Sequence, residues 1–401
     1  MPSPAAPETP PPSGFALFAY GFRPFFLLTG LYGAVSPLIW AVAYLWGLPF
    51  PDIIAPSLWH AHEMVFGFAV AAACGFLLTV VPSWTGTPPL QGKPLMALAA
   101  LWLAGRLVFW FGGAMPAAAT AVIDLAMLPG LMVAVATPIV RSGRARNLPV
   151  VAMLGVILIA NGLFHAEALG LTGDTAALGV RLGVYAFIVL IAIISGRITP
   201  MFTANVLRMT APDAVVSTPK HAQPIAFAAV LAAAAAHLAE APDTVTGGLA
   251  LAAALALSWR MSRWQTARTL RLPILWILHT ANLWVIAGFA CLAGSKLAGW
   301  PTEDAALHAL TAGAMGSAIL AVMTRAGLGH TGRPIDPPKP VAAAYFLITG
   351  AALVRVFGVA TGEYYLPFVL GSAVLWALAY ALFTMVYVSV LTRPRADGRP
   401  G

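Results

Sequence analysis

The sequence predicts an all-α, multi-pass membrane protein with about twelve transmembrane helices. Of its 401 residues, 60% are hydrophobic and only 9% are charged, whereas about a quarter of the residues in a soluble globular protein are charged. The apolar residues occur in runs of about 20, the length that a helix needs to cross a bilayer. The net charge of +8 does not indicate nucleic-acid binding, because the basic residues lie at the ends of these runs. We therefore expect the lipid bilayer as a partner and no nucleic acid.

The first predicted helix, 25–46, is expected to be an uncleaved anchor, because the Pro-rich residues before it lack the basic start of a signal peptide. The seventh run is short and Ala-rich. One membrane domain, 25–391, is expected between a Pro-rich cytoplasmic tail, 1–24, and a second tail, 392–401. The predicted spans, in order, are 25–46, 59–81, 94–113, 116–139, 149–171, 177–201, 223–240, 245–262, 273–294, 304–326, 341–360 and 365–391.

The charged residues predict the orientation of these spans. Most Arg and Lys residues, such as those of 141–146 and 260–271, lie at the helix ends of one predicted side. The loops of the other side carry Lys296 and otherwise acidic residues. Because basic loops stay in the cytoplasm, both termini are expected there, which requires an even number of spans.

Part of the sequence is repeated at an offset of 246 residues. Between 59–94 and 305–340, eight positions are identical, among them His62/His308, Gly67/Gly313 and Lys93-Pro94/Lys339-Pro340. Internal repeats are common in membrane proteins. We therefore predict three four-helix units, 25–140, 149–262 and 273–391, of which the middle one has the fewest matching residues.

Four histidines, His60, His62, His165 and His308, fall in apolar helices near the predicted outer face. An ionisable residue in a membrane span is costly and indicates a functional site, and imidazole commonly binds haem iron and copper. On a regular helix His60 and His62 point about 200° apart, so they cannot both bind one metal unless the turn is irregular. On a regular helix, His60 and His62 would bind two different metal centres, or one of them would only orient a metal ligand through a hydrogen bond. Glu63 could also orient a ligand in this way. The alternative to a metal site is that the first helical turn carrying His60 and His62 simply faces water. For His165, the alternative is an ordinary hydrogen bond to a neighbouring helix.

The repeat makes His62 and His308 the predicted axial pair of a haem on two helices. Only two cysteines are present, Cys74 and Cys291, and no C-x-x-C-H motif occurs, so the haem would be of the b type, without a covalent link. His60, His165 and Glu63 are then candidates for copper binding or for supporting roles, and the metal-ligand candidates include His62 and His308 as well.

A second site is predicted at the cytoplasmic side. There, arginines could pair with haem propionates or another anion, or could simply anchor the helices. Its candidate residues are His279, His330, Arg23, Arg197, Arg325 and Arg333. Arg106 and Arg355 lie within spans and are expected to pair or to line a cavity, with Asp124 as the expected partner of Arg106. His221 and His237 are not assigned to a site.

Several segments resemble the NnrS family. They are 21–26 (GFRPFF), 59–68 (WHAHEMVFGF), 161–170 (NGLFHAEALG), 196–203 (GRITPMFT), 272–279 (LPILWILH) and 308–334 (HALTAGAMGSAILAVMTRAGLGHTGRP). The resemblance covers most of the chain, although 205–270 carries few recognisable motifs. It implies a twelve-helix protein of the bacterial inner membrane that binds haem and copper and takes part in the response to nitric oxide.

Three functions are consistent with these features. The first is a haem and copper protein that binds nitric oxide or reacts with it, as an oxidoreductase would, in nitrosative stress tolerance or denitrification. The second is a transporter of copper, haem or a small solute, which twelve spans, repeats and buried charges would suit. The third is an electron carrier with haem at each side of the membrane.

Overall fold

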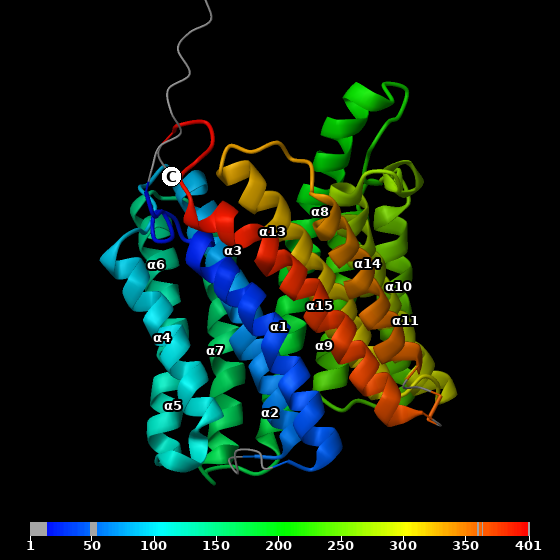
Figure 1. Cartoon of the computed structure of the whole chain (residues 1–401). Helices are drawn as coiled ribbons and strands as arrows, with labels where there is room; N and C mark the ends of the chain where they lie inside the picture. Colours follow the sequence, from blue (N-terminus) through cyan, green and yellow to red (C-terminus); the bar gives the residue numbers. More distant parts are fainter. Residues whose placement is uncertain (1–13, 49–53, 359–360, 363, 400–401) are drawn as a thin grey trace, which may run out of the picture.

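The protein is a bundle of long, roughly parallel helices (Figure 1). The computed structural model describes residues 14–48, 54–358, 361–362 and 364–399, and within these ranges it contains helices and loops but no β-strand. Residues 1–13 of the predicted N-terminal tail and residues 400–401 of the C-terminal tail lie outside the described residues. The all-helical membrane fold that the composition predicts is confirmed.

Every predicted span corresponds to a helix or to a continuous stack of short helices. In chain order these are α1 (Phe22–Trp46); α2 (Pro56–His62), η1 (Glu63–Ala69) and α3 (Val70–Thr85); α4 (Lys93–Trp110); α5 (Ala117–Leu125) and α6 (Met127–Arg141); α7 (Leu148–Ala168); α8 (Thr175–Thr210); α9 (Ala222–Leu238); α10 (Asp243–Met261); α11 (Pro273–Ala298); α12 (Glu303–His308), η5 (Ala309–Met315) and α13 (Gly316–His330); α14 (Lys339–Leu353) and η6 (Val354–Gly358); and α15 (Tyr365–Thr392). Within the described ranges, eleven of these spans are long and apolar enough to cross a membrane. The apolar α9, which the sequence marks as short, has 17 residues.

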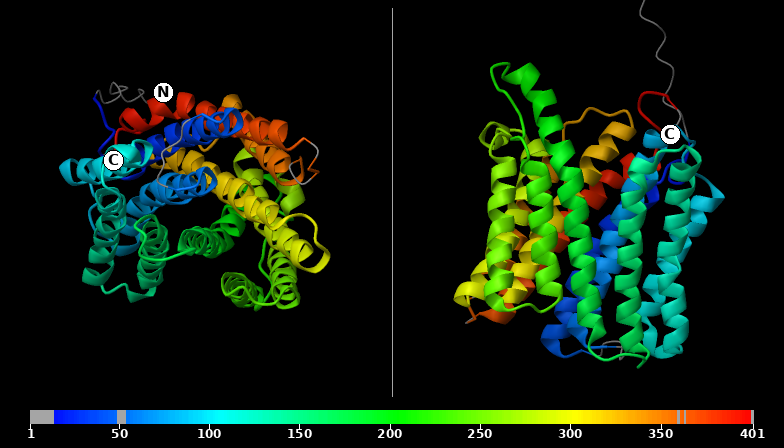
Figure 2. Two further views of the ribbon diagram at one scale, coloured as in Figure 1. Left: turned by 90° about the horizontal axis from the view of Figure 1, so that it is seen from below. Right: turned by 180° about the vertical axis from the view of Figure 1, so that it is seen from behind.

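The two ends of the described chain lie side by side at one end of the bundle. Helix α1 packs along α15, and the amide of Ala16 donates a hydrogen bond of 2.8 Å to the carbonyl of Thr392. Figure 2 shows the same bundle from two further directions. We call this end the terminal face and the other end the distal face. Beyond α15, Arg395 donates a hydrogen bond of 2.8 Å to the carbonyl of His330. The hydrogen bond from Arg395 also lowers the pKa of the exposed Asp397 to about 2.

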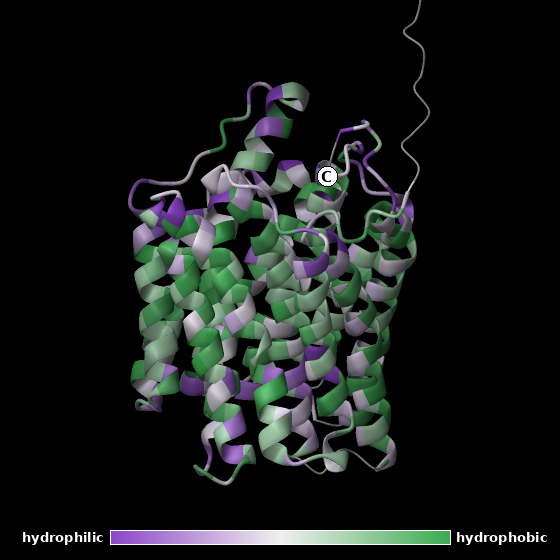
Figure 3. Ribbon diagram, turned by 90° about the vertical axis from the view of Figure 1, so that its left-hand side faces the viewer, coloured by the Kyte–Doolittle hydropathy of each residue, from purple (hydrophilic) through white to green (hydrophobic). Residues whose placement is uncertain are grey.

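Hydrophobic residues occupy the middle of the bundle and hydrophilic residues gather at its two ends (Figure 3). A helix of 20 residues is about 30 Å long, close to the thickness of the hydrocarbon core. The arrangement is therefore that of a multi-pass membrane protein, in which the polar side chains that remain within the apolar band must find partners inside the protein.

Two π-helices occur at positions related by the sequence repeat. Segment η1 covers 63–69 and η5 covers 309–315, again at an offset of 246, and each begins directly after one of the paired histidines, His62 and His308. Such π-helices are rare and are frequent at functional sites. This correspondence supports the relation between the two segments, while the division into three units stays a prediction.

The identical glycines of the two π-helices allow close packing. A Cβ at Gly67 would lie 2.6 Å from Nη1 of Arg106, and a Cβ at Gly313 would lie 2.4 Å from the indole ring of Trp284. Both distances are too short for a carbon atom. The indole of Trp284, packed between helices, cannot move aside as freely as the end of the flexible Arg106 side chain. The glycine at this position therefore fits the helix to a large neighbour.

We predict that Gly313→Ala lowers the free energy of unfolding by about 1–3 kcal/mol, the usual result of overpacking a well-packed core. Thermal unfolding in detergent, followed by circular dichroism, measures the change. Gly248→Ala on α10 is the matched control, because no atom of the described residues lies within 4 Å of where its new methyl group would be and Ala is the better helix former. Equal melting temperatures for Gly313→Ala and the wild type would contradict the prediction.

Candidate functional site

The distal-face histidines separate into two neighbouring groups. His60 and His308 line a cavity of about 350 Å³, whereas His62 and His165 belong to a buried network behind it. The sequence predicts this separation of His60 from His62, because two residues that are two positions apart on a helix point to different sides. The two groups therefore share only the turn of α2 that carries both residues.

His62 lies at the centre of the buried network and is fully inaccessible to solvent. Its Nδ1 is 3.0 Å from Oε1 of Glu63, and its Nε2 is 2.9 Å from Oδ1 of Asn161. The ring is also stacked on Phe109, with 3.9 Å between the ring centroids and 3° between the ring planes. Both neighbouring oxygens are hydrogen-bond acceptors when Glu63 is ionised, and a protonated His62 would satisfy both of them at once.

Asp124 and Arg106 complete this network. Asp124 accepts hydrogen bonds from Nδ2 of Asn161 at 2.8 Å and from Nε2 of His165 at 3.0 Å. Arg106 forms ion pairs with both Asp124 and Glu63, so the predicted pairing of Arg106 with Asp124 is confirmed. Two buried carboxylates thus meet one guanidinium, and a protonated His62 would supply the second positive charge that buried carboxylates require.

Two members of the network were not anticipated from the sequence. Asn161 joins His62 to Asp124, and the hydroxyl of Tyr32 forms a hydrogen bond with Glu63 while accepting one from the indole of Trp110 at 3.0 Å. An Asn four residues before His165 on one helix face is the signal that could have identified the first. Nothing local marks Tyr32, whose role depends on how α1 packs.

The network offers a set of metal ligands. One atom each from His62, Asp124 and His165 lies within 4.8 Å of the others, and two imidazoles with a carboxylate suit first-row transition metals. This buried group could therefore bind a metal. Because ligand imidazoles must be neutral, binding there requires both His62 and His165 to be unprotonated at the nitrogen that meets the metal.

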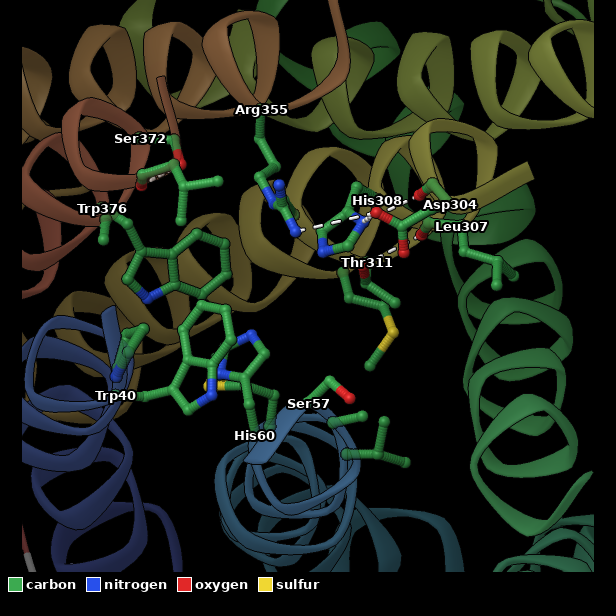
Figure 4. Close-up of a pocket in the computed structure, with 18 of the residues that line it drawn as sticks. Trp40, Ser57, His60, Asp304, Leu307, His308, Thr311, Arg355, Ser372 and Trp376 are labelled. Atoms are coloured by element: carbon green, nitrogen blue, oxygen red, sulfur yellow. Dashed lines mark hydrogen bonds and ion pairs between the residues drawn. The ribbon is translucent and has the colours of Figure 1, made fainter. Parts of the chain in front are cut away.

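The cavity in front of this network is bounded by aromatic and charged side chains. Figure 4 shows His60 and His308 extending from different helices toward the same space, beside Trp40, Trp376 and Arg355. The ring of His60 is stacked on Trp40 with 4.1 Å between centroids. Nδ1 of His308 donates to the carbonyl of Asp304 over 2.7 Å, so in the neutral ring Nε2 would be the unprotonated nitrogen that can act as a ligand.

Three buried polar atoms of the cavity wall have no hydrogen-bond partner among the described residues. They are Nδ1 of His60, Nη1 of Arg355 and Nε1 of Trp376, and all three residues line the cavity. An unsatisfied buried polar atom costs about 1–3 kcal/mol and is rare in folded proteins. The wall therefore suits a ligand that brings polar or metal partners to these atoms, and the prediction that Arg355 lines a cavity is confirmed.

The structure corrects the expected pairing of His62 with His308. His62 is held by Glu63, Asn161 and Asp124 and does not line the cavity. His308 shares the cavity with His60 instead. The two repeat-related histidines start equivalent π-helices, but their rings meet different neighbours, and those neighbours decide which way each ring points.

At the terminal face, three of the six predicted residues come together. Arg197, Arg325 and His330 line a cavity of about 860 Å³, together with Arg146, which no sequence motif indicated. Among the described residues that line it, none is Asp or Glu. The guanidinium carbon of Arg325 lies 3.6 Å from the centroid of the Phe202 ring. The rim of this cavity could therefore bind an anionic group.

The other three predicted residues lie elsewhere. Arg23 is buried and donates to the carbonyls of Leu391 and Arg393 at 3.0 and 2.7 Å, so it ties α1 to the end of α15. His279 lies between Thr203 and Thr266 and is not a lining residue of the cavity. Arg333 contacts the carbonyl of Thr331 at 3.4 Å.

The unassigned His237 also has a structural role. It forms hydrogen bonds with the hydroxyl of Tyr185 at 2.6 Å and with Glu303 at 2.9 Å, and Glu303 pairs with Lys296 at 2.7 Å. This group connects α8, α9, α11 and α12 at the distal face, and His237 itself does not line the distal cavity.

Comparison with known proteins identifies one family. The family model described as "NnrS protein" matches residues 16–395, which is nearly the whole chain. No curated protein matches the sequence.

We predict that Arg106→Met lowers the free energy of unfolding by about 3–5 kcal/mol, because it leaves two buried carboxylates with one counter-charge. Thermal unfolding of the purified protein measures the loss. The matched control is Arg268→Met, whose partner Asp213 is 71% exposed and whose loss should cost less than about 1 kcal/mol. Similar losses in the two variants would show that the network is not a buried ion pair of the kind described.

Proposed function

The chain belongs to the NnrS family, and on this basis we propose that it binds nitric oxide at a metal cofactor held between His60 and His308. Family membership supports a part in the response to nitric oxide, and the apolar helices support a multi-pass membrane protein. The proposal adds a site, a ligand and a cofactor, haem b or copper, and a location in the bacterial inner membrane.

One observation carries the proposal. Two histidines from different helices face one cavity, where His308 presents a free Nε2 and His60 has a buried Nδ1 without a partner among the described residues. Imidazoles from two helices could hold a haem or a copper ion without a cysteine link, and nitric oxide would need one coordination position of that metal to be left open or only weakly held. When bound, a reduced haem or copper would supply the metal centre to which nitric oxide attaches.

The remaining wall residues have roles that follow from their contacts. Asp304 orients His308 through its carbonyl and lies 3.7 Å from Nη2 of Arg355 through its carboxylate. Arg355 keeps a second nitrogen, Nη1, for an anionic group of the cofactor. Trp40 and Trp376 cover the apolar part of the cavity and exclude water from it.

The buried network is proposed as a copper site that supports the first. His62 and His165 would be the imidazole ligands, Asp124 the carboxylate, and Glu63 the group that orients His62. The network and the cavity are joined through residues 60–62, so a metal at each would be close enough to exchange electrons. Arg106 would keep the charge of the site balanced.

We predict that His60→Ala and His308→Ala each change the optical spectrum of the purified protein and reduce its nitric oxide-induced spectral shift. Spectra are recorded oxidised, reduced and with nitric oxide after expression with added haem and copper. His237→Ala is the control, since this histidine is also buried but belongs to a separate group. Spectra of the two cavity variants that match the wild type in all three states would exclude this site.

Copper content should respond to the other pair of histidines. We predict that His62→Ala and His165→Ala lower the copper bound per protein, while His237→Ala retains it. Copper affinity in the wild type should rise with pH, because imidazole ligands bind a metal only in their neutral form. Metal analysis after dialysis at several pH values measures both effects. A copper content that is unaffected by His62→Ala and His165→Ala would contradict the assignment.

A further inference from the structure

The distal cavity and the terminal-face cavity share lining residues with a third cavity, which we call the central cavity. This central cavity, of about 80 Å³, shares seven lining residues with the terminal-face cavity, namely Phe26, Phe76, Leu190, Ile194, Ile198, Leu278 and Val322. It shares Met315 with the distal cavity that holds His60 and His308. The three cavities therefore follow one another from face to face, with Met315 between the central and the distal one.

The central cavity has an apolar wall. Among the described residues, its lining consists of aromatic, aliphatic and Met side chains and a single hydroxyl residue, Ser195. Several positions are alanines, including Ala73 and Ala318, so the backbone rather than a large side chain borders the space. Ions and strongly hydrated molecules are disfavoured beside such a wall, whereas xenon and small apolar molecules are compatible with it.

Met315 lies between the central cavity and the distal cavity. It is the last residue of η5, the π-helix that begins directly after His308. The proposed metal ligand His308 therefore precedes η5, and the side chain between the central and the distal cavity lies at the end of η5. Met315 is 3% exposed, and its unbranched side chain adopts more conformations than a branched one.

We propose that these cavities form an internal route along which an uncharged diatomic molecule reaches the distal cavity, with Met315 as its constriction. The inference rests on the proposed function, in which nitric oxide is the molecule that binds there. The apolar central part of such a route admits a small neutral gas and disfavours ions, including anions held at the arginines of the terminal-face cavity.

The first test narrows the route at Ala318, which is half-buried and borders the central cavity. In the cofactor-loaded protein in nanodiscs, we expect Ala318→Phe to slow both association and dissociation of carbon monoxide and nitric oxide by about tenfold, leaving Kd unchanged. A barrier on a route acts on both directions equally, whereas a change at the metal alters Kd. Stopped-flow absorbance and flash photolysis give the two rates.

Two further variants make the result specific. Met315→Ala should raise both rates, because it opens the constriction. Ala287→Phe is the matched control, since Ala287 is also half-buried but lines none of the three cavities described above, and its rates should equal those of the wild type. Wild-type rates in Ala318→Phe, or a changed Kd with an unchanged dissociation rate, would overturn the route.

A second readout does not need the cofactor. Xenon should bind the cofactor-free wild type, seen as a concentration-dependent shift in ¹²⁹Xe NMR, and Ala318→Phe should remove this shift while Ala287→Phe keeps it. If the loaded wild type binds no gas, the proposed function fails, and the xenon result then decides the route alone. Absence of xenon binding in the wild type would overturn the route even if nitric oxide binds.

Discussion

The arrangement of the distal face depends on one charged residue, Arg106, held between two carboxylates inside the bundle. Glu63 and Asp124 come from different helices, and each would be an isolated buried charge without this guanidinium. Because the surrounding lipid offers no partner, the helices must bring these groups together. Gly67 leaves the space that Arg106 requires. The position of His62, and through the shared turn that of His60, follows from this ion-paired network.

The π-helices connect the packing with the site. Each adds one residue to a turn, so the side chains on either side of it face different directions from those of a regular helix. Here η1 follows His62, η5 follows His308, and η6 contains Arg355. All three segments contribute residues to the distal cavity or to the buried network beside it.

The sequence was sufficient to predict a structural feature where its pattern allows only one physical arrangement. Apolar runs of membrane length predicted the helices, isolated charges predicted the pair of Arg106 with Asp124, and the angle between neighbouring helical positions separated His60 from His62. The partner of His308 was wrong, because identity within a repeat does not determine which neighbour a ring faces. Arg23 met backbone carbonyls of α15 instead of the terminal-face cavity. Asn161, Tyr32 and Arg146 have roles that exist only once distant helices are packed.

The contact between the first and the last helix also constrains how the protein is made. Helix α1 is synthesised before all the other described helices, yet it packs along α15, which follows them in the sequence. The guanidinium of Arg23 receives its carbonyl partners Leu391 and Arg393 only at that point. Until then, one side of α1 must face lipid or a chaperone within the membrane. Insertion of the helices and assembly of the bundle are therefore separate events in the biosynthesis of this chain.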